Sequence, residues 1–265
     1  MLEKYFNMRY CFDRDEVVER IDQRLQEEGS GYICVADGVV LNIANRDADY
    51  RKVTDGAMFS ICDSSYVPLY LNWIYGIKRE QYCGAMIFRD LVSARGQMHD
   101  SQCTMHGEGS KYRMIFMGTS QNVLDGLKKN LTENFNPDCA GMQFVELPFR
   151  KVEEFDYPEI AKMIEEDGAD IVWVALGAPK QDFFMNRLQT HLHHGVMIGV
   201  GAAFKFYSGQ EEKRAPQWMV RHHMEFIYRI WQDPKKQLSR CWWIVRTLPN
   251  MFFEEVKRKH QNAAK

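Results

Sequence analysis

Short apolar runs alternate with longer amphipathic stretches along the first 200 residues or so. The runs are YICVA (31–35), AMFSIC (57–62), YRMIFM (112–117), MQFVEL (142–147), DIVWVAL (170–176) and GVMIGVGA (195–202). Apolar residues spaced three and four apart predict helices over 16–28, 67–76, 122–135, 159–167 and 180–192. Because strands that alternate with helices need crossover connections, we expect a largely parallel sheet with helices on both faces, an α/β Rossmann-like core.

The pattern changes after residue 209. Residues 210–265 contain no strand-like run, are dense in Trp, Phe and Met, and interleave these with Lys and Arg. We therefore predict two parts: a core of residues 1–209 and a basic-aromatic helical appendage of residues 210–265. Such a stripe is often core packing with a solvated charged side. The same composition also suits a segment lying among lipid headgroups, or a lid over a diphosphate, and these interpretations stay open.

Composition and charge exclude several classes of protein. The chain has 265 residues, of which 45% are hydrophobic and 26% charged, which is typical of a globular protein and not of a disordered one. Its formal net charge of -2 argues against a general nucleic-acid binder. The N-terminus lacks a signal-peptide pattern, and no apolar run reaches the ~18 residues of a membrane span. We expect a cytoplasmic protein, or one attached to a membrane without crossing it.

In open α/β sheets ligands bind beyond the carboxyl ends of the strands, so the residues that follow each strand are the first candidates. The most informative is the segment VWVALGAPKQD (172–182). Gly177 allows backbone amides to approach a ligand, and the helix that begins near Lys180 offers free N–H groups to an anion. Lys180 and Gln181 can reach a phosphate or a sugar. A plain strand-to-helix turn, with Pro179 in the first helical turn, explains the same residues equally well.

A second strand end reads Gly118-Thr119-Ser120 and precedes a helix. It forms either a shallow anion nest or an ordinary helix cap by Ser120. The spacing matches neither the GxGxxG fingerprint of dinucleotide sites nor the P-loop, so an NAD-dependent enzyme is poorly supported.

Two aspartates also follow predicted strands. Asp63 comes directly after the 57–62 run, where a carboxylate could act as a general base towards a sugar hydroxyl. Capping of the next helix is the other explanation, a role that Ser64 or Ser65 could also fill. Asp37, after the first run, has the same two interpretations.

The sequence gives no support for a metal site. His191, His193 and His194 do not have a zinc-site spacing, and we expect them to lie on the surface or to pack locally. No DxD-type carboxylate pair occurs in a loop after a strand, so a divalent cation is not required.

Three segments, taken in order, are more specific than any single motif. VALGAPKQD (174–182), GVGAAFKFYSGQEEKRAPQWM (199–219) and MEFIYRIWQDPKK (224–236) closely resemble the WecG/TagA/CpsF family of bacterial glycosyltransferases, glycosyltransferase family 26. The resemblance implies an inverting, metal-independent enzyme without a cofactor. Such an enzyme moves a sugar from a UDP-sugar to an undecaprenyl-diphosphate-linked amino sugar, in the synthesis of cell-surface polysaccharides. It implies peripheral attachment to the cytoplasmic membrane face, and family members are often homo-oligomers.

The resemblance also implies roles for particular residues. The base of the family is an aspartate that is followed by an apolar helix and then a glycine, which here correspond to Asp63 and Gly84, although Ser64 replaces the usual next glycine. Asp37 falls at a family asparagine, and Lys205 stands where an aspartate near the nucleotide is common. Basic residues of the appendage would meet the diphosphate, namely Arg214, Arg221 and Arg229.

The departures at Ser64 and Lys205 leave an alternative open. The chain could be a non-catalytic nucleotide-sugar-binding or scaffold subunit of a polysaccharide assembly complex. Binding is expected in both cases, so turnover is the property that separates them.

Overall fold

The computed structural model describes residues 2–93, 111–209, 231 and 234–263. In these ranges eight strands form one sheet in the order β1-β2-β4-β3-β8-β7-β5-β6. All neighbouring strands are parallel except β1 and β2. The strands are β1 (Glu3–Tyr5), β2 (Met8–Tyr10), β3 (Gly31–Ala36), β4 (Phe59–Cys62), β5 (Met114–Gly118), β6 (Gln143–Val145), β7 (Ile171–Ala175) and β8 (Val196–Gly199).

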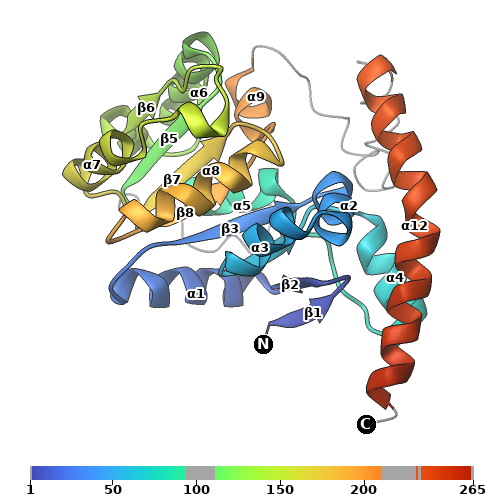
Figure 1. Ribbon diagram of the computed structural model, residues 1–265. Coiled ribbons are helices and arrows are strands. Elements are labelled where there is room, and N and C mark those ends of the chain that lie inside the picture. Colours follow the sequence, from blue (N-terminus) through green and yellow to red (C-terminus); the bar gives the residue numbers. More distant parts are fainter. Residues whose placement is uncertain (1, 94–110, 210–230, 232–233, 264–265) are drawn as a thin grey trace.

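Helices connect the strands and cover the sheet (Figure 1). The α-helices are α1 (Arg14–Gln26), α2 (Gly38–Arg46), α3 (Ala48–Gly56), α4 (Tyr66–Tyr75), α5 (Gly84–Val92), α6 (Gln121–Asn134), α7 (Tyr157–Asp167), α8 (Lys180–Leu188), α9 (Ala203–Ser208) and α12 (Pro234–Ala263). Short 3-10 turns are η1 (Pro137–Gly141), η2 (Val152–Glu154) and η3 (Gln189–His191). The predicted α/β class is confirmed, and each of the six strands and five helices expected from the sequence is present.

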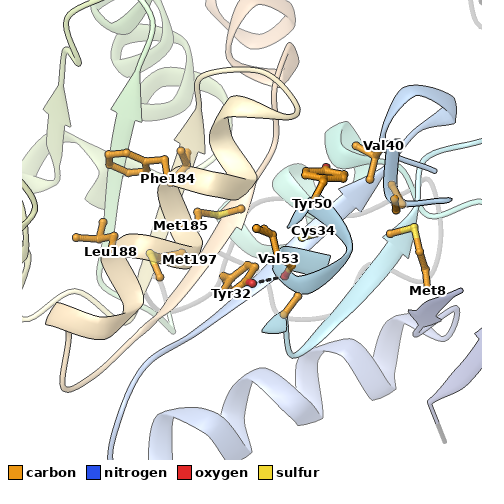
Figure 2. Packing of buried hydrophobic residues seen from close by; sticks show 14 of the residues in the cluster. Met8, Tyr32, Cys34, Val40, Tyr50, Val53, Phe184, Met185, Leu188 and Met197 are labelled. Carbon is orange, nitrogen blue, oxygen red and sulfur yellow. Dashed lines mark hydrogen bonds between the residues drawn. The ribbon is translucent and has the colours of Figure 1, made fainter. Parts of the chain in front are cut away.

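Two apolar cores lie on the two faces of the sheet, because successive side chains of a strand point to opposite sides. In β3, Tyr32 and Cys34 belong to the core under α2, α3, α4, α7 and α8, whereas Ile33 and Val35 belong to the core under α1, α5, α6 and α9. Figure 2 shows part of the first core, where Tyr32 donates a hydrogen bond to the Val53 carbonyl of α3. The buried sheet therefore presents only its strand ends to ligands.

The N-terminal hairpin β1–β2 was not predicted. Its strands have three residues each, too short for a clear alternation, and they are joined at Phe6 and Asn7, which have left-handed φ angles of 50° and 64°. Tyr10 of β2 pairs with Ser60 of β4, so the hairpin extends the edge of the parallel sheet.

The C-terminal helix α12 packs along α2 and α4 (Figure 1). Thr247, Met251 and Glu255, spaced four residues apart, form its buried stripe. The Glu255 carboxylate accepts hydrogen bonds from the Phe6 N–H at 3.0 Å and the Tyr75 hydroxyl at 2.9 Å. It therefore ties the helix to the hairpin turn and to α4. None of the helices in the described ranges is long and apolar enough to span a bilayer.

Candidate active site

The carboxyl ends of the parallel strands β4, β3, β8 and β7 lie next to one another along one edge of the sheet. From β3 the chain passes to β4 on one side and then crosses to β5 on the other, with β8 and β7 between them. A reversal of this kind creates a crevice in which the loops after neighbouring strands diverge, and it is the usual ligand position in such sheets. The loops after β3, β4, β7 and β8 carry most of the predicted site residues.

Asp63 follows β4 at this edge and is held by several hydrogen bonds. Its N–H donates to the Ala36 carbonyl at 3.1 Å, and its own carbonyl accepts from Gln81 Nε2 at 2.8 Å. Its carboxylate Oδ1 accepts from the Gly84 N–H, the first amide of α5, at 3.3 Å. The structure thus places the Gly84 amide against the Asp63 carboxylate and leaves Asp63 partly exposed. Asp63 does not cap α4, whose N-cap is Ser65, but its carboxylate accepts the first amide of α5 and so satisfies the start of that helix.

Gly84 lies where space is limited. A Cβ atom at this position would be 3.3 Å from Val35 Cγ1 and 3.5 Å from the Val200 carbonyl oxygen. The glycine therefore allows the start of α5 to approach the ends of β3 and β8 closely, which is how the Gly84 amide reaches Asp63.

Asp37 is the N-cap of α2. Its Oδ1 accepts from the N–H groups of Val39 and Val40 at 2.8 and 2.9 Å. Ala36 pairs with Cys62 in the β3–β4 register, so Asp37 and Asp63 follow directly paired residues of adjacent strands. The capping interpretation of Asp37 is thus observed, and its predicted contact with substrate stays a prediction.

Gln181 joins the two loops that follow β7 and β8. Its Oε1 accepts from the N–H of Gly177 and from the N–H of Gly201, both at 3.1 Å. The side chain is only 2% exposed, and Gly199 provides the space for it, since a Cβ there would be 2.8 Å from Gln181 Nε2. Gln181, which was predicted to reach a phosphate or a sugar, is thus buried and positions the loops at Gly177 and Gly201.

Lys180 stands at the start of α8 beside aromatic rings. Its Nζ lies 5.0 Å from the ring centroid of Phe149 and 5.4 Å from that of Phe155. Phe149 is fully exposed in the loop after β6. Pro179 precedes the helix after a cis Ala178–Pro179 peptide bond.

Of the remaining predicted site residues, Lys205 and Gly118 lie within the described ranges and the three arginines do not. Lys205 lies on α9 and is partly buried. Gly118 ends β5 with a φ of 113°, and a Cβ there would be 2.8 Å from the Ala175 carbonyl oxygen, so close packing against β7 requires glycine. Arg214, Arg221 and Arg229 lie outside the described residues.

Asp182 is a buried carboxyl that the strand-end reasoning missed. It is fully buried in the first turn of α8, and its Oδ2 accepts from the Tyr50 hydroxyl at 2.5 Å. Burial raises the pKa of Asp182 to about 7, with a smaller contribution from the negative charge of Asp37, while the hydrogen bond from Tyr50 lowers it. An acidic residue in a first helical turn normally indicates a favourable helix-dipole interaction at the surface, so no sequence signal identified it.

The histidines lie away from this edge. His193 Nδ1 is 2.7 Å from a Glu165 carboxylate oxygen, and His194 Nε2 is 3.2 Å from an oxygen of Asp170, both near the amino ends of β7 and β8. The expected local surface role is confirmed. Among the described side chains, no three His, Cys, Asp or Glu residues cluster as ligands of a metal ion would.

Comparison with known proteins identifies the family of this chain. Residues 7–264 match the model of the glycosyl transferase WecG/TagA/CpsF family. A protein of Bacillus spizizenii (strain W23), named N-acetylglucosaminyldiphosphoundecaprenol N-acetyl-beta-D-mannosaminyltransferase, is 24% identical over 90% of this chain and 84% of its own length. A protein of the same name from Bacillus subtilis (strain 168) is 26% identical over 83% of this chain and 78% of its own length.

Proposed function

The chain belongs to the glycosyl transferase WecG/TagA/CpsF family, and we propose that it transfers a sugar from a UDP-sugar to an amino sugar carried on undecaprenyl diphosphate, with inversion at the anomeric carbon. The names of the two Bacillus relatives support a lipid-diphosphate acceptor and an N-acetylhexosaminyl donor. Both names specify a β-linked product, which requires inversion if the donor is an α-linked nucleotide sugar. The observation that carries the proposal is the position of Asp63, held by the Gly84 amide at the carboxyl edge of the sheet.

In the proposed reaction Asp63 is the general base. The acceptor hydroxyl attacks the anomeric carbon from the face opposite to UDP, the new C–O bond forms as the bond to the diphosphate oxygen breaks, and the hydroxyl proton passes to the Asp63 carboxylate. The hydrogen bonds to the backbone of residue 63 hold its carboxylate in place before substrate binds. Asp37, one residue past the paired strand position, is proposed to contact the substrate from the neighbouring loop.

The leaving diphosphate needs positive charge, and we propose that protein groups supply it without a metal ion. Helix α8 begins at this loop with the positive end of its helix dipole, and Lys180 adds a full charge. The loop at Gly118 would bring backbone amides to the phosphates. The Gly177 amide already donates to Gln181 Oε1, so the proposed role of Gly177 is to let the backbone approach the phosphates closely. Lys205 is proposed to contact the donor from α9, and Arg214, Arg221 and Arg229 would complete the charge from the segment outside the described residues.

An acceptor anchored by a polyprenyl chain lies in a membrane, so the enzyme would work as a peripheral protein on the cytoplasmic membrane face. The basic-aromatic composition of the C-terminal region supports this location. The oligomeric state stays a prediction of the family resemblance.

Substitution of Asp63 by Asn tests the proposed base. The amide oxygen of Asn can still accept from the Gly84 N–H, so the fold should persist while proton transfer is lost. We expect kcat with UDP-N-acetylmannosamine and a short-chain prenyl-diphosphate N-acetylglucosamine to fall by roughly 10²- to 10⁴-fold. Asp47→Asn is the matched control, because Asp47 is an exposed cap of α3. Near-normal turnover by Asp63→Asn would remove the assignment.

The same assay examines the other parts of the proposal. Turnover that continues in the presence of EDTA is expected, and a requirement for added Mg²⁺ or Mn²⁺ would contradict metal independence. A wild-type protein that binds UDP-sugars but transfers none of them, across a panel of donors, would instead favour the non-catalytic subunit.

A further inference from the structure

The face formed by α4 and α12 is apolar and exposed. On α4, Leu69 is 51% and Trp73 is 69% exposed, while Val67, Leu71 and Ile74 point into the core. On α12, Phe253 is 69% exposed, and Trp242 and Val245 are 67% and 62% exposed. Exposed apolar residues that occur singly need no explanation, but a group on two packed helices indicates a surface that binds something.

Ring contacts make this face continuous between the two helices. The Tyr70 ring lies 5.9 Å from that of Trp73 on α4 and 5.1 Å from that of Phe252 on α12. Phe252 in turn lies 6.0 Å from Phe253. In Figure 1 the two helices lie side by side along one flank of the molecule. An aromatic series therefore runs from α4, in the catalytic core, to the C-terminal helix.

Charge indicates which partner this surface would meet. The sequence of α12 contains seven basic residues and two acidic ones, in a chain whose formal net charge is -2. These residues are Lys235, Lys236, Arg240, Arg246, Lys257, Arg258 and Lys259 against Glu254 and Glu255. A second copy of the chain docked through the same face would bring two positively charged helices together, which is unfavourable. An anionic lipid surface complements both the charge and the aromatic side chains.

We infer that α4 and α12 together form one lipid-binding surface, so that an element of the catalytic core itself, and not only the C-terminal region, enters the headgroup layer of an anionic membrane. This inference deepens the proposed function and rests on it. Helix α4 begins at Tyr66, three residues after Asp63. Contact of α4 with the bilayer would therefore hold the proposed base close to the membrane surface, where a lipid-linked sugar is presented.

Vesicle binding by charge variants of α4 tests the inference. Asn72 is exposed beside Trp73, and its side chain can be changed without removing apolar surface. We compare the full-length Asn72→Glu and Asn72→Lys variants by cosedimentation with phosphatidylcholine vesicles, with and without phosphatidylglycerol. Asn72→Glu should bind phosphatidylglycerol vesicles about 5-fold or more weakly than Asn72→Lys. Equal binding by the two variants would overturn the inference.

A second pair of variants tests the apolar contacts. Leu69→Gln combined with Trp73→Gln should reduce vesicle partitioning about 10-fold or more. Phe149→Gln, which changes a still more exposed aromatic residue on the loop after β6, should leave partitioning unchanged. Circular dichroism checks that the variants fold. Unchanged vesicle binding, together with loss of a dimer in sedimentation equilibrium, would show a self-association face and refute lipid binding. The vesicle assay contains neither donor nor acceptor, so its result does not depend on catalysis. The proposed function would be refuted by a different result, the absence of turnover by the wild type.

Discussion

The buried carboxyl of Asp182 should make the stability of the protein depend on pH. The side chain is fully buried between α8 and α3, and burial raises its pKa from 3.8 to about 7. In the unfolded chain the group loses its proton near 3.8, so between these two values the folded state binds more protons. The stability associated with the protonated form is complete below pH 3.8 and is lost as the pH rises through about 7.

The size of this effect follows from the two pKa values. At about 1.4 kcal/mol per pH unit, a rise from 3.8 to about 7 corresponds to about 4 kcal/mol over the whole range. Between about pH 5 and about pH 8, where the protein is easier to handle, the expected change is about 3 kcal/mol. Asp182→Asn removes the titration and keeps an oxygen that can accept from the Tyr50 hydroxyl.

Urea unfolding of the wild type and of Asp182→Asn at the two pH values measures the effect. Ionisation of all other groups is common to both proteins and cancels in the difference. The variant should gain about 3 kcal/mol of stability relative to the wild type on going from about pH 5 to about pH 8. Tyr50→Phe is an informative second variant: without the hydroxyl, which lowers the pKa of Asp182, the loss of stability should extend to higher pH. A stability difference between wild type and Asp182→Asn that does not change with pH would refute the reasoning.

Two further predictions concern the loops at the carboxyl edge. Gly118→Ala should lower the free energy of unfolding by roughly 2 kcal/mol or more in thermal or urea denaturation, because its φ is 113° and the new Cβ would meet the Ala175 carbonyl. Gly141→Ala is the control, since a Cβ there would contact nothing within 4 Å, and equal stability of the two variants would contradict the close approach at Gly118. Gln181→Leu should lower the free energy of unfolding by roughly 2 kcal/mol and raise KM for the donor, because the amides of Gly177 and Gly201 lose their acceptor. Gln181→Glu retains a side-chain oxygen and should recover part of the stability and part of the donor affinity. Unchanged KM in Gln181→Leu would show that this bridge does not shape the donor site.

The sequence could predict the elements of the fold because each has a local signal. Strands β3, β5 and β7 are short and uniformly apolar, and their turns carry glycine. The order of the strands has no such signal. Strand β8 lies between β3 and β7 because of packing between residues far apart in the chain. Helix α2 (GVVLNIANR) was missed for another reason: it is only nine residues long, and the consecutive apolar residues Val39, Val40 and Leu41 resemble a short strand as much as a helix.

The residues of the candidate site also fall into two groups, those with a local sequence signal and those without one. Gly177 and Lys180 could be identified as candidates from the sequence alone, because a strand end followed by a helix start is a local pattern that suits either an anion site or a plain turn. Asp63 and Gly84 are 21 positions apart, and nothing between them indicates that the α5 amide reaches the carboxylate; only the family resemblance connected them. The bridge made by Gln181 requires β7 and β8 to be neighbours, which is a property of the sheet order. Local chemistry therefore identifies the groups that could meet a ligand, whereas the buried groups that position them follow only from the packed fold.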